Sequence, residues 1–209
     1  MKLMIIGANG KVGQLLIEEG IKRGHNMTAV VRHENQSLAD SVLMKDLFDL
    51  TKDDIASSDI IISAIGAWSD ESYKNHIKSV DYLANLIKGS SKQLVIVGGA
   101  GSLYLDESNT LQLYETQDFP REYKGLAKAM SDGLQQLRTY SEIDWLYVSP
   151  AAIFDADGVV TKSYQIGGEQ LLLDENGESY ISYRDYAFAL LDILESDDFH
   201  KQRISLLRK

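Results

Sequence analysis

Three glycines near the start of the chain, spaced G-x-x-G-x-x-G, constrain its fold more than any other feature. The first directly follows the apolar segment Lys2–Ile6. Gly7 and Gly10 precede a helical pattern over Lys11–Arg23, and Gly13 lies in its first turn. In such a strand–turn–helix unit, Gly7 permits the tight turn, Gly10 lets the backbone approach a pyrophosphate, and Gly13 lets the helix pack on the strand. The first helical turn then offers unpaired N–H groups to phosphate oxygens. The pattern predicts a dinucleotide-binding loop; the alternative is a tight turn that binds nothing.

Short apolar runs alternate with amphipathic helical patterns over the first 149 residues. Strands that are apolar throughout are typical of a parallel sheet covered on both faces by helices. We therefore predict a doubly wound α/β fold, whose ligand lies beyond the carboxyl ends of the strands. The expected strands are Lys2–Ile6, Met27–Val31, Ser41–Met44, Ile60–Ala64, Leu94–Val97 and Trp145–Ser149, and the expected helices are Lys11–Arg23, Ser72–Lys88 and Arg121–Tyr140.

The pattern changes after Pro150. Glu169–Leu173 and Glu178–Ile181 flank a turn-forming sequence, Asp-Glu-Asn-Gly, and predict a β-hairpin. We interpret the whole chain as one domain, in which residues 151–209 form a small lid on the substrate side.

A last helix is expected from Ser182 to about Glu195. Asp185 stands three residues after Ser182, which resembles a capping box with Asp in place of the usual Glu or Gln. Ile204–Leu207 is expected to add a short final strand.

Composition narrows the class of protein. The chain has 209 residues, 44% of them hydrophobic, with no cysteine and a formal net charge of −10. A negative field repels nucleic-acid backbones, so a general nucleic-acid binder is not expected. Without cysteine there is no disulfide framework or thiolate metal site, and the four histidines lack metal-ligand spacing. With no long apolar run or signal peptide, we expect a cytoplasmic protein that does not enter a membrane.

The end of the second strand bears on the choice of nucleotide. Sites that prefer NAD carry an acidic residue there to bind the ribose hydroxyls, whereas this strand ends in Arg32 and His33. A guanidinium can bind a 2′-phosphate through two hydrogen bonds, so we predict NADPH over NADH. The alternatives are a solvated strand-end charge at Arg32 and a surface histidine at His33. Asp46 is placed to accept a hydrogen bond from the adenine amino group.

The predicted cofactor site spans the ends of several strands. Small residues after the fourth strand are expected where backbone passes close to a cofactor. The residues expected to hold the cofactor are Gly7, Asn9, Gly10, Lys11, Val12, Gly13, Arg32, His33, Asp46, Leu47, Ala64, Ile65, Gly66 and Gly98.

With these motifs the chain resembles the atypical short-chain dehydrogenases/reductases of the NAD(P)H-binding, NmrA-like group. Within it, the sequence is most similar to bacterial NADH-flavin reductase-like proteins and, more distantly, to biliverdin reductase B. The more specific segments are Gly98–Ser102 (Gly-Gly-Ala-Gly-Ser) and Ile181-Ser182 with Asp185-Tyr186-Ala187. The resemblance implies a Rossmann-like fold, bound NAD(P)H, and reduction of flavins, quinones or similar acceptors, with flavin as a substrate and not a bound cofactor. It also implies that a homodimer would be common among such proteins.

The usual catalytic pair of the larger superfamily is missing. None of the eleven tyrosines has a lysine four residues on. Tyr123 comes nearest, but Lys128 at five residues would point about 140° away on a helix. Ser102, Tyr123 and Lys124 are the catalytic candidates; the alternatives are a loop hydroxyl bonded to its own backbone, a buried aromatic and a surface charge.

The segment between Gly98 and Pro120 is long and carries several apolar residues, so it either lines an acceptor pocket or packs down as a flap. Its apolar residues are Leu103, Tyr104, Leu105, Leu111, Leu113, Tyr114 and Phe119.

Three functions fit the sequence. The first is an NAD(P)H-dependent reductase that transfers hydride to a flavin, quinone or similar planar acceptor, because such transfer needs no Tyr–Lys proton relay. The second is a redox sensor of the NmrA type, which binds NADP(H) without turnover. The third, an enzyme resembling nucleotide-sugar epimerases, fits least well, because it lacks the Tyr–Lys pair and its C-terminal part is short.

Overall fold

The central sheet of the computed structural model, which describes residues 1–209, has the strand order β3-β2-β1-β4-β5-β6-β10-β8. Neighbouring strands are parallel, except that β8 runs antiparallel to β10. This is the predicted doubly wound, Rossmann-like fold. The strands are β1 (Lys2–Ile6), β2 (Asn26–Val31), β3 (Ser41–Met44), β4 (Ile60–Ser63), β5 (Gln93–Val97), β6 (Asp144–Ser149), β8 (Tyr164–Gly167) and β10 (Gln202–Arg208).

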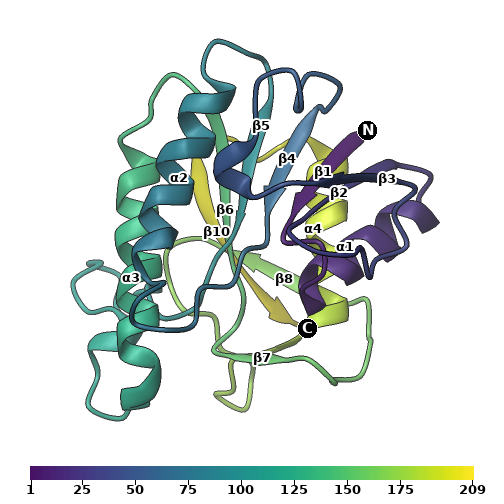
Figure 1. Ribbon diagram of the computed structural model, residues 1–209. Coiled ribbons are helices and arrows are strands. Elements are labelled where there is room, and N and C mark those ends of the chain that lie inside the picture. The colour runs from purple at the N-terminus through teal and green to yellow at the C-terminus, as the bar shows by residue number, and fades with distance from the viewer.

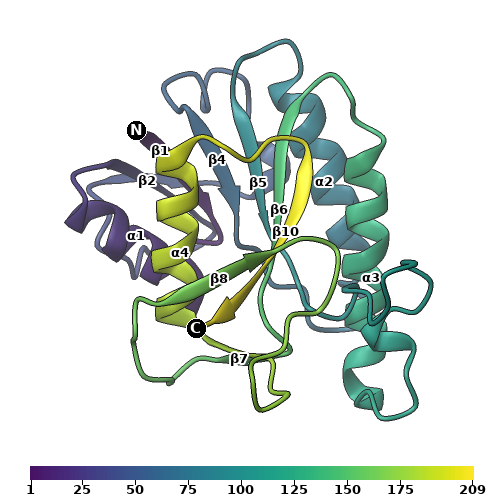
Figure 2. The ribbon, with the colours of Figure 1, turned by 180° about the vertical axis from the view of Figure 1, so that it is seen from behind.

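Helices cover both faces of the sheet (Figure 1). α1 (Lys11–Lys22) and α4 (Tyr183–Ser196) pack together on one face, and α2 (Lys74–Ile87) and α3 (Arg121–Arg138) pack together on the other. Figure 2 shows the molecule from the opposite side, with α4 in front of the sheet. No helix is long and apolar enough to cross a lipid bilayer.

Two buried clusters, one on each face, explain why the strands are apolar throughout. Along β1, Ile5 enters the cluster under α1 and α4, whereas Met4 and Ile6 enter the cluster under α2 and α3. Successive side chains of a strand point to opposite faces, so a sheet covered on both sides needs apolar residues at every position.

Helix ends follow the sequence signals closely. α1 ends at Lys22, with Arg23 as the C-cap and Gly24 at a φ of 77°, a backbone conformation that favours glycine. Ser182 caps α4 by accepting a hydrogen bond from the Asp185 N–H at 3.0 Å. The reciprocal bond, in which the Asp185 carboxylate would accept from the Ser182 N–H, does not form, because this carboxylate accepts from the backbone N–H groups of Thr161 and Lys162 instead.

The hairpin expected over residues 169–181 is wrong, although its turn forms. Asp174 and Gly177 close the turn, but the flanking segments pair with other parts of the chain. β9 (Tyr180–Ser182) lies parallel to β7 (Ile153–Asp155), and the backbone of Glu169 and Leu171 bonds to Tyr104. Distant partners therefore determine the pairing of this region. β7 lies beyond the carboxyl ends of the parallel strands (Figure 1).

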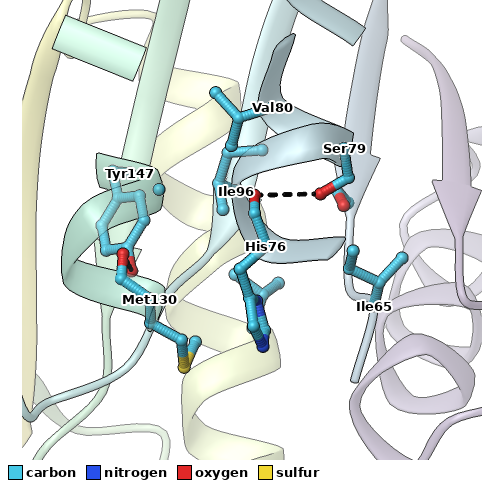
Figure 3. A pocket seen from close by; sticks show the side chains of 10 residues that line it. Ile65, His76, Ser79, Val80, Ile96, Met130 and Tyr147 are labelled. Carbon is cyan, nitrogen blue, oxygen red and sulfur yellow. Dashed lines mark hydrogen bonds between the residues drawn. The ribbon is translucent and has the colours of Figure 1, made fainter. Parts of the chain in front are cut away.

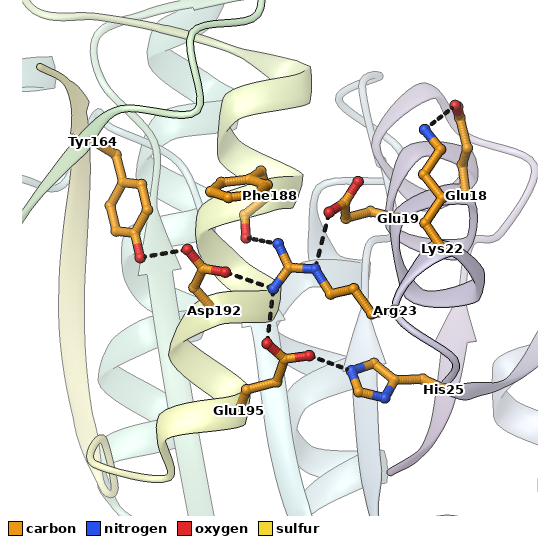
Figure 4. A network of polar contacts seen from close by, with 9 residues as sticks. All are labelled: Glu18, Glu19, Lys22, Arg23, His25, Tyr164, Phe188, Asp192 and Glu195. Atoms are coloured by element: carbon orange, nitrogen blue, oxygen red, sulfur yellow. Dashed lines mark hydrogen bonds and ion pairs between the residues drawn. The ribbon is translucent and has the colours of Figure 1, made fainter.

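Arg23 joins the two helices of one face (Figure 4). Its guanidinium donates to the carboxylates of Asp192 at 2.6 Å, Glu195 at 2.9 Å and Glu19 at 2.9 Å, and to the carbonyl of Phe188 at 3.1 Å. The contacts fix the end of α1 against α4, opposite the end of α1 that carries the glycine loop.

Candidate functional site

The glycine loop packs tightly against the end of β4. Gly7 has a φ of 82°, and a Cβ there would lie 2.7 Å from the carbonyl oxygen of Ala64. A Cβ on Gly13 would lie 2.5 Å from the carbonyl oxygen of Gly7. Both positions therefore exclude any side chain, which is the condition for a helix N-terminus to reach the strand ends.

The N-terminus of α1 has free donors. The backbone N–H groups of Lys11, Val12 and Gly13 form no hydrogen bond, and Gly10, the N-cap, supplies no side chain to satisfy them. Such a cluster of N–H groups at the positive end of a helix fits a pyrophosphate. The residues present therefore suit the nucleotide that the sequence predicts.

Asn9 joins two loops at the carboxyl ends of the strands, the glycine loop after β1 and the segment after β2. Its side-chain amide donates to the carbonyl of Glu34 at 2.8 Å, and its side-chain carbonyl accepts from the Gln36 N–H at 2.8 Å. Both ends of the Asn9 side chain are thus engaged with the segment after β2. In the structure Asn9 shapes the predicted cofactor site by holding that segment beside the glycine loop.

Arg32 and His33 are exposed at the carboxyl end of β2, and neither forms a hydrogen bond or ion pair. Asp46 follows β3 and caps the short helix η1 (Leu47–Asp49), with Oδ1 accepting from the Phe48 N–H at 3.0 Å. Its Oδ2 has no protein partner. A guanidinium and a carboxylate oxygen are thus both available on the β2–β3 side of the edge.

The ends of β4 and β5 are closely packed. Ala64 N–H donates to Ile6 at 2.9 Å, which ties the start of the β4 loop to β1. A Cβ on Gly66 would meet the indole of Trp68 at 2.3 Å, and one on Gly98 would meet the ring of Tyr147 at 2.1 Å. The buried Tyr147 ring leaves no room for a side chain at Gly98, whereas the neighbour of Gly66 is an exposed indole; a cofactor-binding role for either glycine stays a prediction.

The three catalytic candidates occupy different surroundings. Ser102 is 2% exposed, and its hydroxyl and carbonyl oxygens accept from Arg203 at 3.0 and 2.8 Å. Lys124 donates to the carbonyl of Thr116 at 2.9 Å. Tyr123 is 52% exposed at the start of α3, and its hydroxyl has no protein partner. Ser102 is thus bonded to Arg203 inside a buried polar cluster, and a catalytic role for its hydroxyl stays a prediction.

Arg203 is a residue that sequence reasoning missed. Its side chain is fully buried on β10, where it also donates to the carbonyl oxygen of Glu169 at 3.0 Å and to the Glu169 carboxylate. Arg138 donates to the same carboxylate at 2.6 Å. Because Ser102 and Arg203 are 101 residues apart, no local pattern could have indicated the contact.

The long segment between Gly98 and Pro120 folds back on itself. Leu105 N–H donates to Leu111 and Leu113 N–H donates to Leu103, both at 2.9 Å. Leu103 is buried, whereas Leu105 and Leu111 remain exposed. η2 (Leu113–Glu115) completes the turn. Leu103 therefore packs down as a flap would, while Leu105 and Leu111 stay open to solvent, and the lining of an acceptor pocket by this segment stays a prediction.

A small cavity of about 20 Å³ lies between α2, α3 and the ends of β4 and β5 (Figure 3). This is room for one water molecule. His76, also missed by the sequence analysis, points into it from the first turn of α2, and its Nε2 is 3.2 Å from the carbonyl oxygen of Ala67. Because a carbonyl only accepts, Nε2 carries the proton and Nδ1 is left as an acceptor. Burial lowers the pKa of His76, which favours the neutral ring.

The fold and this edge define a dinucleotide-binding α/β protein. A family model described as NAD(P)H-binding matches residues 7–197, and the chain belongs to that family. This confirms the resemblance that the sequence motifs indicate.

Individual proteins are similar to this chain over nearly its whole length. The chain is 40% identical to the uncharacterized protein YwnB of Bacillus subtilis (strain 168), over 99% of this chain and 98% of that one. A crystal structure from Streptococcus pneumoniae TIGR4, assigned as an NADH-flavin reductase, is 49% identical over the whole of both chains, with a TM-score of 0.98. A structure from Bacteroides thetaiotaomicron, assigned as an epimerase, is 32% identical over 99% of this chain and 96% of that one, with a TM-score of 0.85.

Proposed function

We propose that the protein is an NAD(P)H-dependent oxidoreductase that passes hydride to a flavin, a quinone or a similar planar acceptor. The observation that carries this proposal is that the predicted nucleotide site, at the carboxyl ends of the parallel strands, lacks a Tyr–Lys pair. The Lys124 ammonium donates to the Thr116 carbonyl and the Lys128 ammonium to the Asp132 carboxylate, while the Tyr123 hydroxyl has no protein partner. Reduction of a flavin by direct hydride transfer needs mainly proximity and orientation, which the chain can supply without a proton relay.

We propose NADPH as the preferred reductant. The free N–H groups of the first turn of α1 would bind the pyrophosphate, and Arg32 would bind the 2′-phosphate. The unpartnered oxygen of Asp46 would accept from the adenine amino group. The reduced nicotinamide, which supplies the hydride, would lie at the carboxyl ends of β4 and β5.

The flavin enters this proposal as a substrate. The similarity to the Streptococcus pneumoniae protein assigned as an NADH-flavin reductase supports this choice. An acceptor that binds and leaves suits an edge that is open to solvent at Arg32, Trp68 and Tyr123.

The test is a titration with NADPH and with NADH, followed by nicotinamide fluorescence, with FMN and a quinone then added to the same sample. We expect tighter binding of NADPH and steady oxidation on addition of an acceptor. Gly13→Ala should abolish both, because its Cβ would meet the Gly7 carbonyl, whereas Gly168→Ala, with open space around it, should abolish neither. Binding without oxidation would favour the redox sensor, and no binding of either nucleotide would refute the proposal.

A further inference from the structure

Trp68 is a large apolar side chain left open to solvent. The residue is 70% exposed, and its indole N–H has no protein partner. The indole folds back over Gly66, since a Cβ there would lie 2.3 Å from Nε1 and 3.1 Å from Cδ1. One edge of the ring system therefore lies on the backbone at the end of β4 while the rest faces solvent. An exposed indole offers a flat apolar face on which a planar ring can stack.

The backbone on both sides of Trp68 is anchored. Ala67 is buried, and its carbonyl accepts from His76. On the other side, the Ser69 N–H donates to the Ser72 hydroxyl at 3.0 Å, and the Tyr73 N–H donates to the Ser69 carbonyl at 3.0 Å. An anchored loop presents the indole at a defined place, which lowers the entropy lost when a ligand binds.

The strand order locates Trp68 on one half of the nucleotide site. Arg32 ends β2, on one side of β1, whereas Trp68 follows β4, on the other side. If Arg32 binds the adenosine phosphate, the nicotinamide lies on the β4–β5 side, because the dinucleotide crosses the edge at the point where the strand order reverses. Trp68 therefore lies on the half where hydride is transferred.

The start of α3 meets the Trp68 loop. Tyr73 packs on Gly125, where a Cβ would lie 2.6 Å from the Tyr73 ring. Trp68 precedes Tyr73 by five residues, so the segment that carries the indole contacts the first turns of α3. A flat ligand entering beside the nicotinamide would meet the indole of Trp68.

We propose that the indole of Trp68 is the platform on which the planar ring of the acceptor stacks, beside the nicotinamide half of the site. The inference rests on the proposed reductase function and deepens it by naming a residue that touches the acceptor. Stacking on an indole favours extended conjugated rings such as isoalloxazine over small aliphatic carbonyl compounds. Trp68 supplies affinity and orientation and takes no part in proton transfer.

The test compares the wild-type protein with Trp68→Phe, Trp68→Ala and a control, Ile21→Ala, which removes an exposed apolar residue from α1. Kinetic measurements give KM for FMN and KM for NADPH. A second measurement follows the quenching of tryptophan emission by FMN in the presence of NADP⁺. The protein has two tryptophans, and Trp68→Ala retains only the buried Trp145, so the quenching that this variant loses relative to the wild type reports on Trp68.

We expect Trp68→Ala to raise KM for FMN by about tenfold, as loss of one stacked ring would. KM for NADPH should not change, Trp68→Phe should retain most of the affinity, and Ile21→Ala should behave as the wild type. An unchanged KM for FMN in Trp68→Ala, or an equal rise in KM for NADPH, would overturn the proposal that the acceptor stacks on Trp68.

Failure of the proposed function gives a different result. If the wild-type protein binds NADPH but fails to oxidise it with any of the acceptors, the proposed reductase function is refuted. Equilibrium dialysis against FMN then decides the platform separately: about tenfold weaker binding by Trp68→Ala supports it, and equal binding by all variants, or none by the wild type, overturns it.

Discussion

The carbonyl oxygen of Ala64 lies 2.7 Å from the point that a Cβ on Gly7 would occupy. The loop after β1 and the end of β4 therefore contact each other through their backbones. The strand order reverses between these two strands, β1 and β4. This close approach brings the first turn of α1 to the edge where the free N–H groups of Lys11, Val12 and Gly13 gather.

Gly7→Ala should destabilise the protein by about 2 kcal/mol or more, because the left-handed φ and the contact with Ala64 both resist a side chain. Gly24→Ala is the matched control: its φ is 77°, but no atom lies within 4 Å of the new Cβ. It should cost only the backbone strain, about 1 kcal/mol. Chemical denaturation measures both, and equal losses would show that the Ala64 contact is unimportant.

Arg32→Asp should weaken NADPH binding by about 10- to 100-fold, since a charge-assisted contact to the 2′-phosphate is replaced by repulsion. NADH binding should change little. Lys78→Glu, at an exposed position on α2, makes the same change in net charge and should affect neither nucleotide. Isothermal titration gives the four affinities for the two variants; parallel losses of NADPH and NADH binding in Arg32→Asp would contradict the assignment.

Arg203→Met should destabilise the protein by about 3 kcal/mol, because it leaves the buried oxygens of Ser102 unpaired and removes one partner of Glu169. Arg138→Met, which removes the more exposed partner of Glu169, should cost less. Unfolding midpoints in urea provide the comparison. A wild-type midpoint for Arg203→Met would show that the Ser102 contact contributes nothing.

His76 should make the protein less stable in acid. Burial holds its pKa below the ordinary 6.5, so the unfolded chain binds the proton first as the pH falls below that value. The free energy of unfolding should therefore decrease from about pH 6.5 downward, and His76→Gln should reduce this decrease.

His200 should act in the opposite direction. Its hydrogen bond to Asp144, at 2.8 Å, and the Asp197 carbonyl raise its pKa above 6.5. Its contribution to stability is complete below pH 6.5 and is lost as the pH rises through the folded-state pKa. His200→Gln should remove part of that alkaline loss, and the effect should be modest because the side chain is 44% exposed. Thermal unfolding from pH 5 to pH 8 tests both histidines, and identical pH profiles for wild type and variants would contradict both assignments.

The sequence predicts most of the fold because its signals there are local. The glycine loop, the apolar strands and the Ser182 cap depend on residues within a few positions of one another, and the structure agrees at each. The failed hairpin over residues 169–181 had an equally good local turn. Its flanking segments pair instead with Tyr104 and β7, which no local pattern specifies.

The candidate site was predictable to the same extent. Arg32 and the glycines stand at strand ends that periodicity locates. The buried contact of Ser102 with Arg203 could not be predicted, because Arg203 lies 101 residues farther along the chain. His76 was hidden within an amphipathic helix, and its environment depends on Ala67 and on the packing of α2 against α3.

The central claim is direct hydride transfer from NADPH to a planar acceptor at the carboxyl edge of the sheet. The most direct test is an anaerobic single turnover, in which the protein is mixed with FMN and one equivalent of NADPH or of NADPH carrying deuterium at C4 of the nicotinamide. We predict that the absorbances of NADPH and oxidised flavin fall together, and more slowly with the deuterated nucleotide. Flavin that stays oxidised while NADPH remains bound, or bleaching at the rate seen without protein, would contradict the account.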